Sequence, residues 1–139
     1  MKKYRVFVVE DDEQDFEFLK EAFTEADCTD DILHFQNAGQ LMSALGSIPS
    51  DQYPALIVLD HQTSGSNGTD AVRHIRANKD LESIVVVVYS GSIPAELEKK
   101  LLQYGVDLCL VKGNSAKDIL GHVRMFHELV EKNLRSTKL

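Results

Sequence analysis

Residues 55–68 read ALIVLDHQTSGSNG, five apolar residues that run into a single acid, Asp60, before the chain turns polar and glycine-rich. An unbroken apolar run of this kind is typical of a strand that is buried on both faces, as in a parallel sheet covered by helices. The Ser, Gly and Asn residues that follow are typical of a loop. This stretch therefore predicts a buried parallel strand that carries Asp60 at its carboxyl end.

Other segments repeat the pattern, and two of them are apolar runs of the same type, VFVV at 6–9 and IVVVVY at 84–89. The predicted strands are Tyr4–Val9, Ile32–Gln36, Ala55–Asp60, Ile84–Tyr89 and Asp107–Val111. Between and after them, apolar residues recur at helical spacing, as at Phe16, Leu19 and Phe23. This alternation predicts an α/β fold with an open, doubly wound sheet. A chain of 139 residues has room for one such domain, residues 1–139.

The acids are concentrated near the N-terminus, where residues 10–31 hold eleven Asp or Glu against one Lys, and the formal net charge is −7. Such a field repels phosphate backbones, so we expect no nucleic-acid partner. No segment has the length and apolarity of a membrane span or a secretory signal, so we expect no membrane association. The two cysteines, Cys28 and Cys109, lie far apart and form no metal motif, which favours a cytoplasmic protein.

Reactive side chains stand where four of the predicted strands end, which is the edge of an open α/β sheet where ligands bind. They are Glu10, Asp11, Asp60, Ser90 and Lys112. Clustered acids repel one another, so a cation must lie among them, either Lys112 or a divalent ion. Carboxylate and carbonyl oxygens suit Mg²⁺ (or Mn²⁺), and we expect the Gln62 backbone carbonyl to join Asp11 and Asp60 as a ligand. An aspartate can also attack a phosphoryl group and form an aspartyl phosphate.

The same residues, in this order and spacing, resemble the receiver domain of bacterial response regulators, the CheY-like superfamily. The resemblance rests on Glu10-Asp11 after a first apolar strand, Asp60 after the third, Gly68 eight residues later, Ser90-Gly91 after the fourth and Lys112 after the fifth. It covers essentially the whole chain. It implies a flavodoxin-like (βα)5 fold with a five-stranded parallel sheet in the order 2-1-3-4-5.

The resemblance also implies roles for individual residues. Asp60 would be the phosphoacceptor of a sensor histidine kinase or a histidine phosphotransfer protein, with Glu10 and Asp11 as the metal-binding pair. Ser90 would be the signalling hydroxyl and Lys112 the lysine that pairs with the phosphate. The expected protein is a stand-alone response regulator of a two-component system, without an output domain, that switches binding to an unknown downstream protein. Its own chemistry would be at most self-phosphorylation from a phosphodonor and self-dephosphorylation.

Four positions depart from the family's pattern. Thr63-Ser64 replaces the usual Met-Pro, which predicts a more mobile loop, and Gly91 stands where Ala is common. Cys109, expected as a buried small residue of the fifth strand, replaces the switch aromatic. Gly113 replaces the proline after the lysine, and because a cis peptide before a non-proline residue is costly, we expect a trans bond there.

Two alternative functions follow from these observations. The departures allow a degenerate receiver that binds partners without phosphorylation. An enzyme or flavin carrier on the same sheet is less consistent with the motifs, because EDDE at 10–13 would repel a cofactor phosphate and residues 64–70 lack the lysine of a P-loop. A dehalogenase-type phosphatase needs Asp-x-Asp, whereas this chain has Asp60-His61-Gln62.

The five histidines form no recognisable metal motif. His122 and His127 are five residues apart and do not share a helix face well, and His34 and His74 lack partners in the sequence pattern. We expect His61 to be a surface loop residue, and the alternative is that it tunes the access of water to a phosphoryl group on Asp60.

Overall fold

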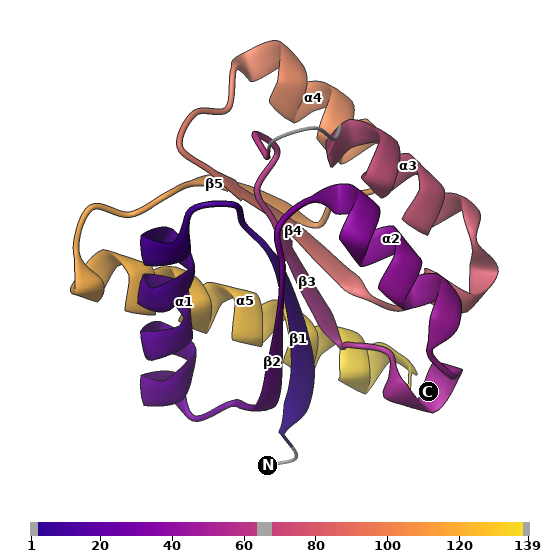
Figure 1. The fold of residues 1–139 in the computed structure, drawn as a ribbon, viewed down its shortest axis with the longest axis horizontal. Helices are drawn as coiled ribbons and strands as arrows, with labels where there is room; N and C mark the ends of the chain where they lie inside the picture. Colours follow the sequence, from indigo (N-terminus) through magenta and orange to yellow (C-terminus); the bar gives the residue numbers. More distant parts are fainter. Residues whose placement is uncertain (1–2, 64–67, 138–139) are drawn as a thin grey trace.

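The computed structural model describes residues 3–63 and 68–137, which form a five-stranded parallel sheet with helices on both faces (Figure 1). The strand order is β2-β1-β3-β4-β5, so the predicted flavodoxin-like fold is confirmed. The strands are β1 (Tyr4–Val9), β2 (Thr29–Phe35), β3 (Leu56–Leu59), β4 (Val85–Ser90) and β5 (Leu108–Val111). The helices are α1 (Glu13–Ala26), α2 (Ala38–Ser47), α3 (Gly68–Ala77), α4 (Ala95–Gln103) and α5 (Ala116–Thr137), with 3₁₀ turns at Ser50–Gln52 and Lys79–Leu81.

The apolar runs form the centre of the sheet. Every residue of β3 and β4 is buried, which is what unbroken Val, Ile and Leu runs predict for strands covered on both faces. Both strands pair in parallel with their neighbours, and the register places Val9 beside Leu59 and Leu59 beside Val88. The carboxyl ends of β1, β3 and β4 therefore lie together at one edge.

The predicted bounds of β2 were wrong at both ends, because the strand spans Thr29–Phe35 rather than Ile32–Gln36. Its first three residues are polar, and β2 is an edge strand whose residues are half-buried or exposed, so hydropathy does not reveal where it begins. Thr29 is held there by its hydroxyl, which donates to the Tyr4 carbonyl at 2.5 Å. The other predicted strands agree with the structure to within a residue at each end.

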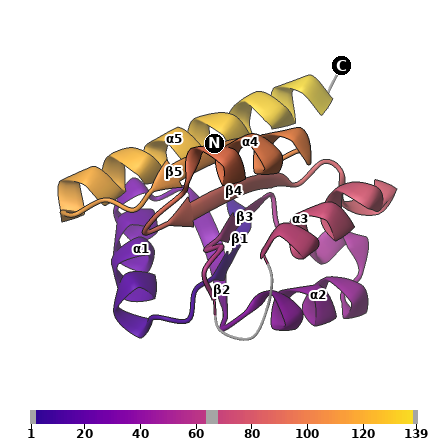
Figure 2. The ribbon, with the colours of Figure 1, turned by 90° about the horizontal axis from the view of Figure 1, so that it is seen from above.

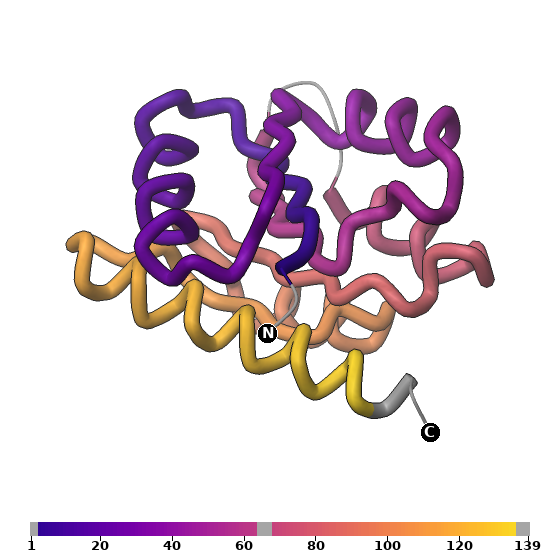
Figure 3. The backbone as a smooth tube through the Cα atoms, turned by 90° about the horizontal axis from the view of Figure 1, so that it is seen from below, coloured from indigo at the N-terminus to yellow at the C-terminus, as the bar shows by residue number. Residues whose placement is uncertain are grey.

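Two hydrophobic cores flank the sheet. One packs α1 and α5 against it through Phe16, Phe23, Val123 and Phe126, and the other packs α2, α3 and α4 on the opposite face. Figure 2 shows α1 and α5 on one side of the sheet and α2 and α3 on the other. In Figure 3, α5 crosses the width of the molecule and α1 lies over its N-terminal half.

The start of α1 fixes the acids that precede it. Asp12 caps the helix, because its side chain accepts a hydrogen bond from the Asp15 amide at 2.9 Å. The Glu10 amide donates to the Phe35 carbonyl at 2.9 Å, so the backbone at Glu10 continues the pairing of β1 with β2. Glu10 and Asp11 thus occupy a short, doubly anchored connection between β1 and α1.

Two phenylalanines of α1 test the core directly. Phe23→Ala should lower the free energy of unfolding by about 3–5 kcal/mol, because a fully buried ring leaves a cavity. Phe18→Ala, on the same helix but 43% exposed, should change it by less than about 1 kcal/mol. Urea unfolding followed by circular dichroism measures both, and equal effects would contradict this packing.

Candidate functional site

Asp60 lies at the carboxyl end of β3, in the middle of the sheet, and is only 5% exposed. Its backbone amide still pairs with the Val9 carbonyl at 3.0 Å, which fixes the start of its side chain. The carboxylate accepts hydrogen bonds from Ser90 Oγ at 2.5 Å and the Gln62 amide at 2.9 Å on Oδ1, and from Lys112 Nζ at 2.7 Å on Oδ2. A buried acid is thus held ionised by three donors.

Lys112 is the cation of the site. Its ammonium lies 2.7 Å from Glu10 Oε1, 2.8 Å from Asp15 Oδ2 and 2.7 Å from Asp60 Oδ2. The lysine reaches this position because its backbone amide donates to the Ser90 carbonyl at 2.8 Å, one step beyond the pairing of β4 with β5. One positive charge is therefore shared by three carboxylates.

Burial and charge act in opposite directions on these groups. Burial lowers the pKa of Lys112, but hydrogen bonds to Asp15, Asp60 and Glu10 outweigh it, so the pKa lies above its ordinary value. Burial raises the pKa of Asp60, but the hydrogen bonds from Lys112, Ser90 and the Gln62 amide outweigh it, so the pKa lies below its ordinary value. Asp60 therefore stays ionised at neutral pH.

Glu10 behaves differently from Asp60. It is 1% exposed, and burial together with the Asp60 charge raises its pKa to about 7, although Lys112 and the Asp12 amide oppose the shift. The Asp12 amide donates to Glu10 Oε2 at 3.2 Å. At neutral pH this carboxyl is poised to exchange a proton for another cation.

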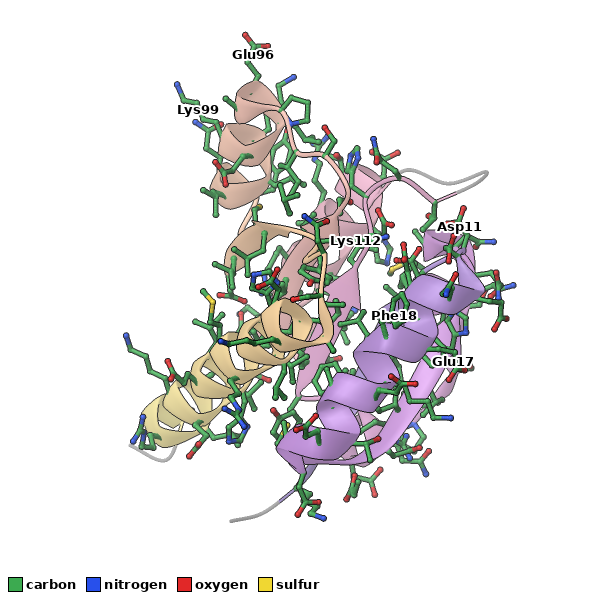
Figure 4. The ribbon with its side chains drawn as sticks, turned by 90° about the vertical axis from the view of Figure 1, so that its left-hand side faces the viewer. Asp11, Glu17, Phe18, Glu96, Lys99 and Lys112 are labelled. Carbon is green, nitrogen blue, oxygen red and sulfur yellow. The ribbon has the colours of Figure 1, made fainter. Side chains whose placement is uncertain are left out.

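Three of the predicted acids converge. Glu10, Asp11 and Asp60 each present a carboxylate oxygen within 4.8 Å of the others, with Asp11 exposed at the mouth of the site. Figure 4 shows Asp11 at the N-terminal end of α1 and Lys112 at a similar height in the same view. An all-oxygen set with more negative charge than Lys112 neutralises fits a hard divalent ion such as Mg²⁺. The Gln62 carbonyl remains a predicted ligand.

Ser90 is fully buried, and its hydroxyl takes part in two hydrogen bonds. Its hydroxyl donates to Asp60 Oδ1 and accepts from the His61 amide at 2.9 Å. The hydroxyl therefore faces the acid already, and it links β4 to the loop that follows β3.

The departures from the family pattern have distinct structural outcomes. Thr63 is buried, whereas Ser64 lies outside the described residues, so the predicted loop mobility stays a prediction. Cys109 was expected to be buried, but it is half-buried, because β5 is an edge strand. It packs against the core of α2, α3 and α4, and burial raises its thiol pKa to about 11. No peptide bond is cis within 3–63 and 68–137, so the expected trans bond before Gly113 is confirmed. A Cβ at Gly91 would meet open space.

The histidines have partners that the sequence did not reveal. His34 lies 2.6 Å from the Glu10 carbonyl through Nε2 and stacks on Phe16 at 3.8 Å, so it supports the acid-bearing connection. His61 is half-buried rather than a free surface residue, with Nε2 3.0 Å from the Thr69 hydroxyl. His34 is at the end of β2, where the sequence showed nothing reactive.

Sequence reasoning also missed two residues that shape the site. Asp15 bonds Lys112, although a helix acid is normally solvated and nothing in the sequence distinguished it from its neighbours. Tyr89 precedes Ser90 and accepts a hydrogen bond from the Gly113 amide at 2.9 Å. The sequence did offer one signal for Tyr89, its position at the end of an apolar strand. A tyrosine there is expected to be buried, and a buried tyrosine hydroxyl needs a hydrogen-bond partner.

A parallel sheet whose carboxyl edge carries an acid cluster, a buried hydroxyl and a half-buried lysine has the arrangement that the sequence predicted for a receiver domain. The family described as "Response regulator receiver domain" matches residues 6–124, and the chain belongs to this family. A comparison with curated proteins gave no match. No helix among the described residues is long and apolar enough to cross a membrane.

Solved structures with this fold include other response regulators. The phosphorylated cyanobacterial phytochrome response regulator RcpA has a TM-score of 0.81 at 21% identity, over 91% of this chain and 93% of that one. The Mn²⁺-bound form of response regulator Rcp1 has a TM-score of 0.75 at 23% identity, over 86% and 88%. Response regulator RPA3017, from red light signalling of R. palustris, has a TM-score of 0.76 at 25% identity, over 87% and 89%.

The raised pKa of Glu10 predicts that Mg²⁺ binding at this site would depend on pH. Below pH of about 7 the carboxyl holds a proton that must leave before the oxygen can bind Mg²⁺, so affinity should fall by up to about tenfold per pH unit. Above that pH the affinity should level off. Titration calorimetry at pH 6 and pH 8 measures this.

Glu10→Gln is the control for this titration. The amide cannot titrate, so the variant should bind Mg²⁺ more weakly at pH 8 and lose most of the pH dependence. An equally steep dependence in the variant would assign the proton to another group.

Proposed function

We propose that Asp60 accepts a phosphoryl group from a histidine kinase or a histidine phosphotransfer protein, and that the phosphorylated domain binds a downstream protein differently. The observation that carries the proposal is the Asp60 carboxylate, ionised and held between Lys112 and Ser90 at 2.7 Å and 2.5 Å. Two further acids beside it supply the cation-binding oxygens that phosphoryl transfer uses. Receiver domains as a family accept phosphoryl groups from histidine kinases, which agrees with this site.

The transfer is a substitution at phosphorus. A carboxylate oxygen of Asp60 attacks the phosphorus of the donor's phosphohistidine, the P–O bond forms, and the P–N bond breaks with its electron pair leaving on the imidazole nitrogen. Buried hydrogen bonds fix the carboxylate in advance, so little orientation is lost at the moment of attack. A carboxylate held in this way at the end of β3 would be a positioned nucleophile.

Charge neutralisation is the second requirement. Mg²⁺, held by Glu10, Asp11, Asp60 and the Gln62 carbonyl, would supply positive charge to the phosphoryl oxygens. Lys112 already contacts Asp60 Oδ2 and is placed to pair with the transferred group, while Ser90 offers its hydroxyl to another oxygen. Each of these side chains would exchange a contact with Asp60 for one with the phosphoryl group.

Signalling would then follow from those exchanged contacts. Moving the Ser90 hydroxyl from Asp60 to a phosphoryl oxygen would disturb its bond with the His61 amide and the end of β4. Cys109 has no aromatic ring that could rotate in response, so the change would pass through the backbone of β4 and β5 to the surface of α4, β5 and α5.

The setting and the class of partner follow from composition. Both cysteines are free thiols, which supports a cytoplasmic setting. The acid-rich N-terminal third supports a protein partner over nucleic acid.

Labelling with a small phosphodonor tests the proposal. Acetyl phosphate with Mg²⁺ should phosphorylate the protein, and Asp60→Asn should abolish the labelling because an amide is not a nucleophile here. Asp70→Asn, which changes an acid of α3 outside the cluster, should label normally. Intact-protein mass spectrometry measures all three.

The outcomes separate the two candidate functions. No labelling of the wild-type chain by acetyl phosphate, with or without Mg²⁺, would favour the degenerate receiver that acts without phosphorylation. Labelling that persists in Asp60→Asn would mean that another residue is the acceptor.

Asp11 tests the metal site separately. Asp11→Ala should weaken Mg²⁺ binding by about tenfold or more, because it removes one of three anionic oxygens. Glu13→Gln removes an exposed acid of the first turn of α1 that is not in the cluster and should leave the affinity nearly unchanged. An Asp11 variant with wild-type affinity in a calorimetric titration would remove Asp11 from the site.

A further inference from the structure

Lys112 is followed by a glycine whose conformation is constrained from outside. A Cβ at Gly113 would lie 2.8 Å from Asp118 Cβ and 3.2 Å from the Ile119 amide nitrogen, so the chain passes against the first turn of α5. Only a residue without a side chain fits this approach. The residue next to Lys112 is thus glycine, the most flexible residue type. Other contacts must therefore restrict the backbone at Gly113.

The backbone around Lys112 is anchored on both sides by consecutive residues of β4. The Lys112 amide donates to the Ser90 carbonyl at 2.8 Å, and the Gly113 amide donates to the Tyr89 hydroxyl at 2.9 Å. The first bond is main chain to main chain. The second bond depends on a single side-chain oxygen, the Tyr89 hydroxyl. This bond holds the peptide group between Lys112 and Gly113.

Tyr89 is itself fixed by its surroundings. The residue is 3% exposed, and its ring meets Phe126 at 5.5 Å and His122 at 5.4 Å between ring centroids, both edge to face. Its hydroxyl lies 2.8 Å from His122 Nδ1. Burial raises the pKa of Tyr89 despite the bond from the Gly113 amide, so the hydroxyl keeps its proton.

The direction of one of these hydrogen bonds is fixed by the groups involved. A backbone amide can only donate, so the Tyr89 oxygen accepts from Gly113. In the contact between Tyr89 and His122 Nδ1, the donor depends on the tautomer of the histidine. The Tyr89 hydroxyl thus links the Gly113 amide to His122 on α5.

We propose that Tyr89 is a positioning residue for phosphoryl transfer, whose hydroxyl holds the Lys112–Gly113 peptide so that the ammonium of Lys112 stays against Asp60. This inference rests on the proposed function of Asp60 and Lys112. Loss of the hydroxyl leaves the Gly113 amide without its acceptor, and the flexible glycine then lets the lysine backbone sample other positions. Lys112 has Asp15 and Glu10 as alternative partners at similar distances, so a small backbone shift is enough to draw it from Asp60.

The chain contains a matched control for this chemistry. Tyr4 on β1 is also buried, and its hydroxyl lies 2.8 Å from Nδ1 of His127 on the same helix, α5. This second tyrosine–histidine pair holds α5 to the sheet but is bonded to neither Lys112 nor Gly113. Tyr4→Phe therefore reproduces the loss of a buried hydroxyl and of a histidine partner without touching the lysine.

The test compares phosphorylation rates of Tyr89→Phe and Tyr4→Phe with acetyl phosphate and Mg²⁺. Tyr89→Phe should label roughly three- to tenfold more slowly, the effect of one lost hydrogen bond, whereas Tyr4→Phe should label at the wild-type rate. Amide hydrogen exchange at Gly113, followed by NMR, should be faster by a similar factor in Tyr89→Phe alone. Equal slowing in both variants would assign the effect to the docking of α5 and overturn the proposal.

A double-mutant cycle separates positioning from general destabilisation. In a Lys112→Ala background, Tyr89→Phe should cause no further loss of rate, because the residue on which it acts is gone. A loss of the same size in both backgrounds would contradict action through Lys112.

Failure of the inference and failure of the proposed function give different results. A wild-type chain that is not labelled contradicts the function of Asp60. A labelled wild-type chain with an unchanged rate in Tyr89→Phe leaves that function intact and contradicts the role of Tyr89 alone.

Discussion

The contact between the Lys112 ammonium and the carboxylates of Glu10, Asp15 and Asp60 is the interaction on which the site depends. It joins the ends of β1, β3 and β5 and the first turn of α1. Three acids at this spacing would repel one another strongly without a cation, and one lysine only partly neutralises them. The remaining negative charge favours the binding of a further cation, and the raised pKa of Glu10 predicts that this carboxyl would lose its proton when the cation binds.

The buried sheet supplies rigid supports for that cluster. Asp60, Glu10 and Lys112 each leave the sheet through a backbone amide that still pairs with a neighbouring strand. Fully buried β3 and β4 give these pairs no freedom to slide, because a shift of one residue would turn every side chain to the opposite face. The apolar core thereby fixes the positions of charged groups that would otherwise move apart.

Local hydropathy and a simple topological rule predicted the parallel sheet and the residues at its carboxyl edge, whereas the strand order was implied by the resemblance to receiver domains. Prediction from the sequence failed where a residue's role is set by a tertiary contact. Asp15 looks like any solvated acid of a helix until α1 brings it to Lys112. The role of Tyr89 depends on an amide 24 residues away, and the start of β2 depends on pairing by polar residues at an edge.

The central claim is that the acid at the end of β3 receives the phosphoryl group. The most direct measurement is chemical trapping after treatment with acetyl phosphate and Mg²⁺: borohydride reduces an aspartyl phosphate to homoserine, and tandem mass spectrometry of the peptides locates it. Homoserine at position 60 is the predicted result. Homoserine at Asp11 or at another acid, with Asp60 unmodified, would contradict the claim.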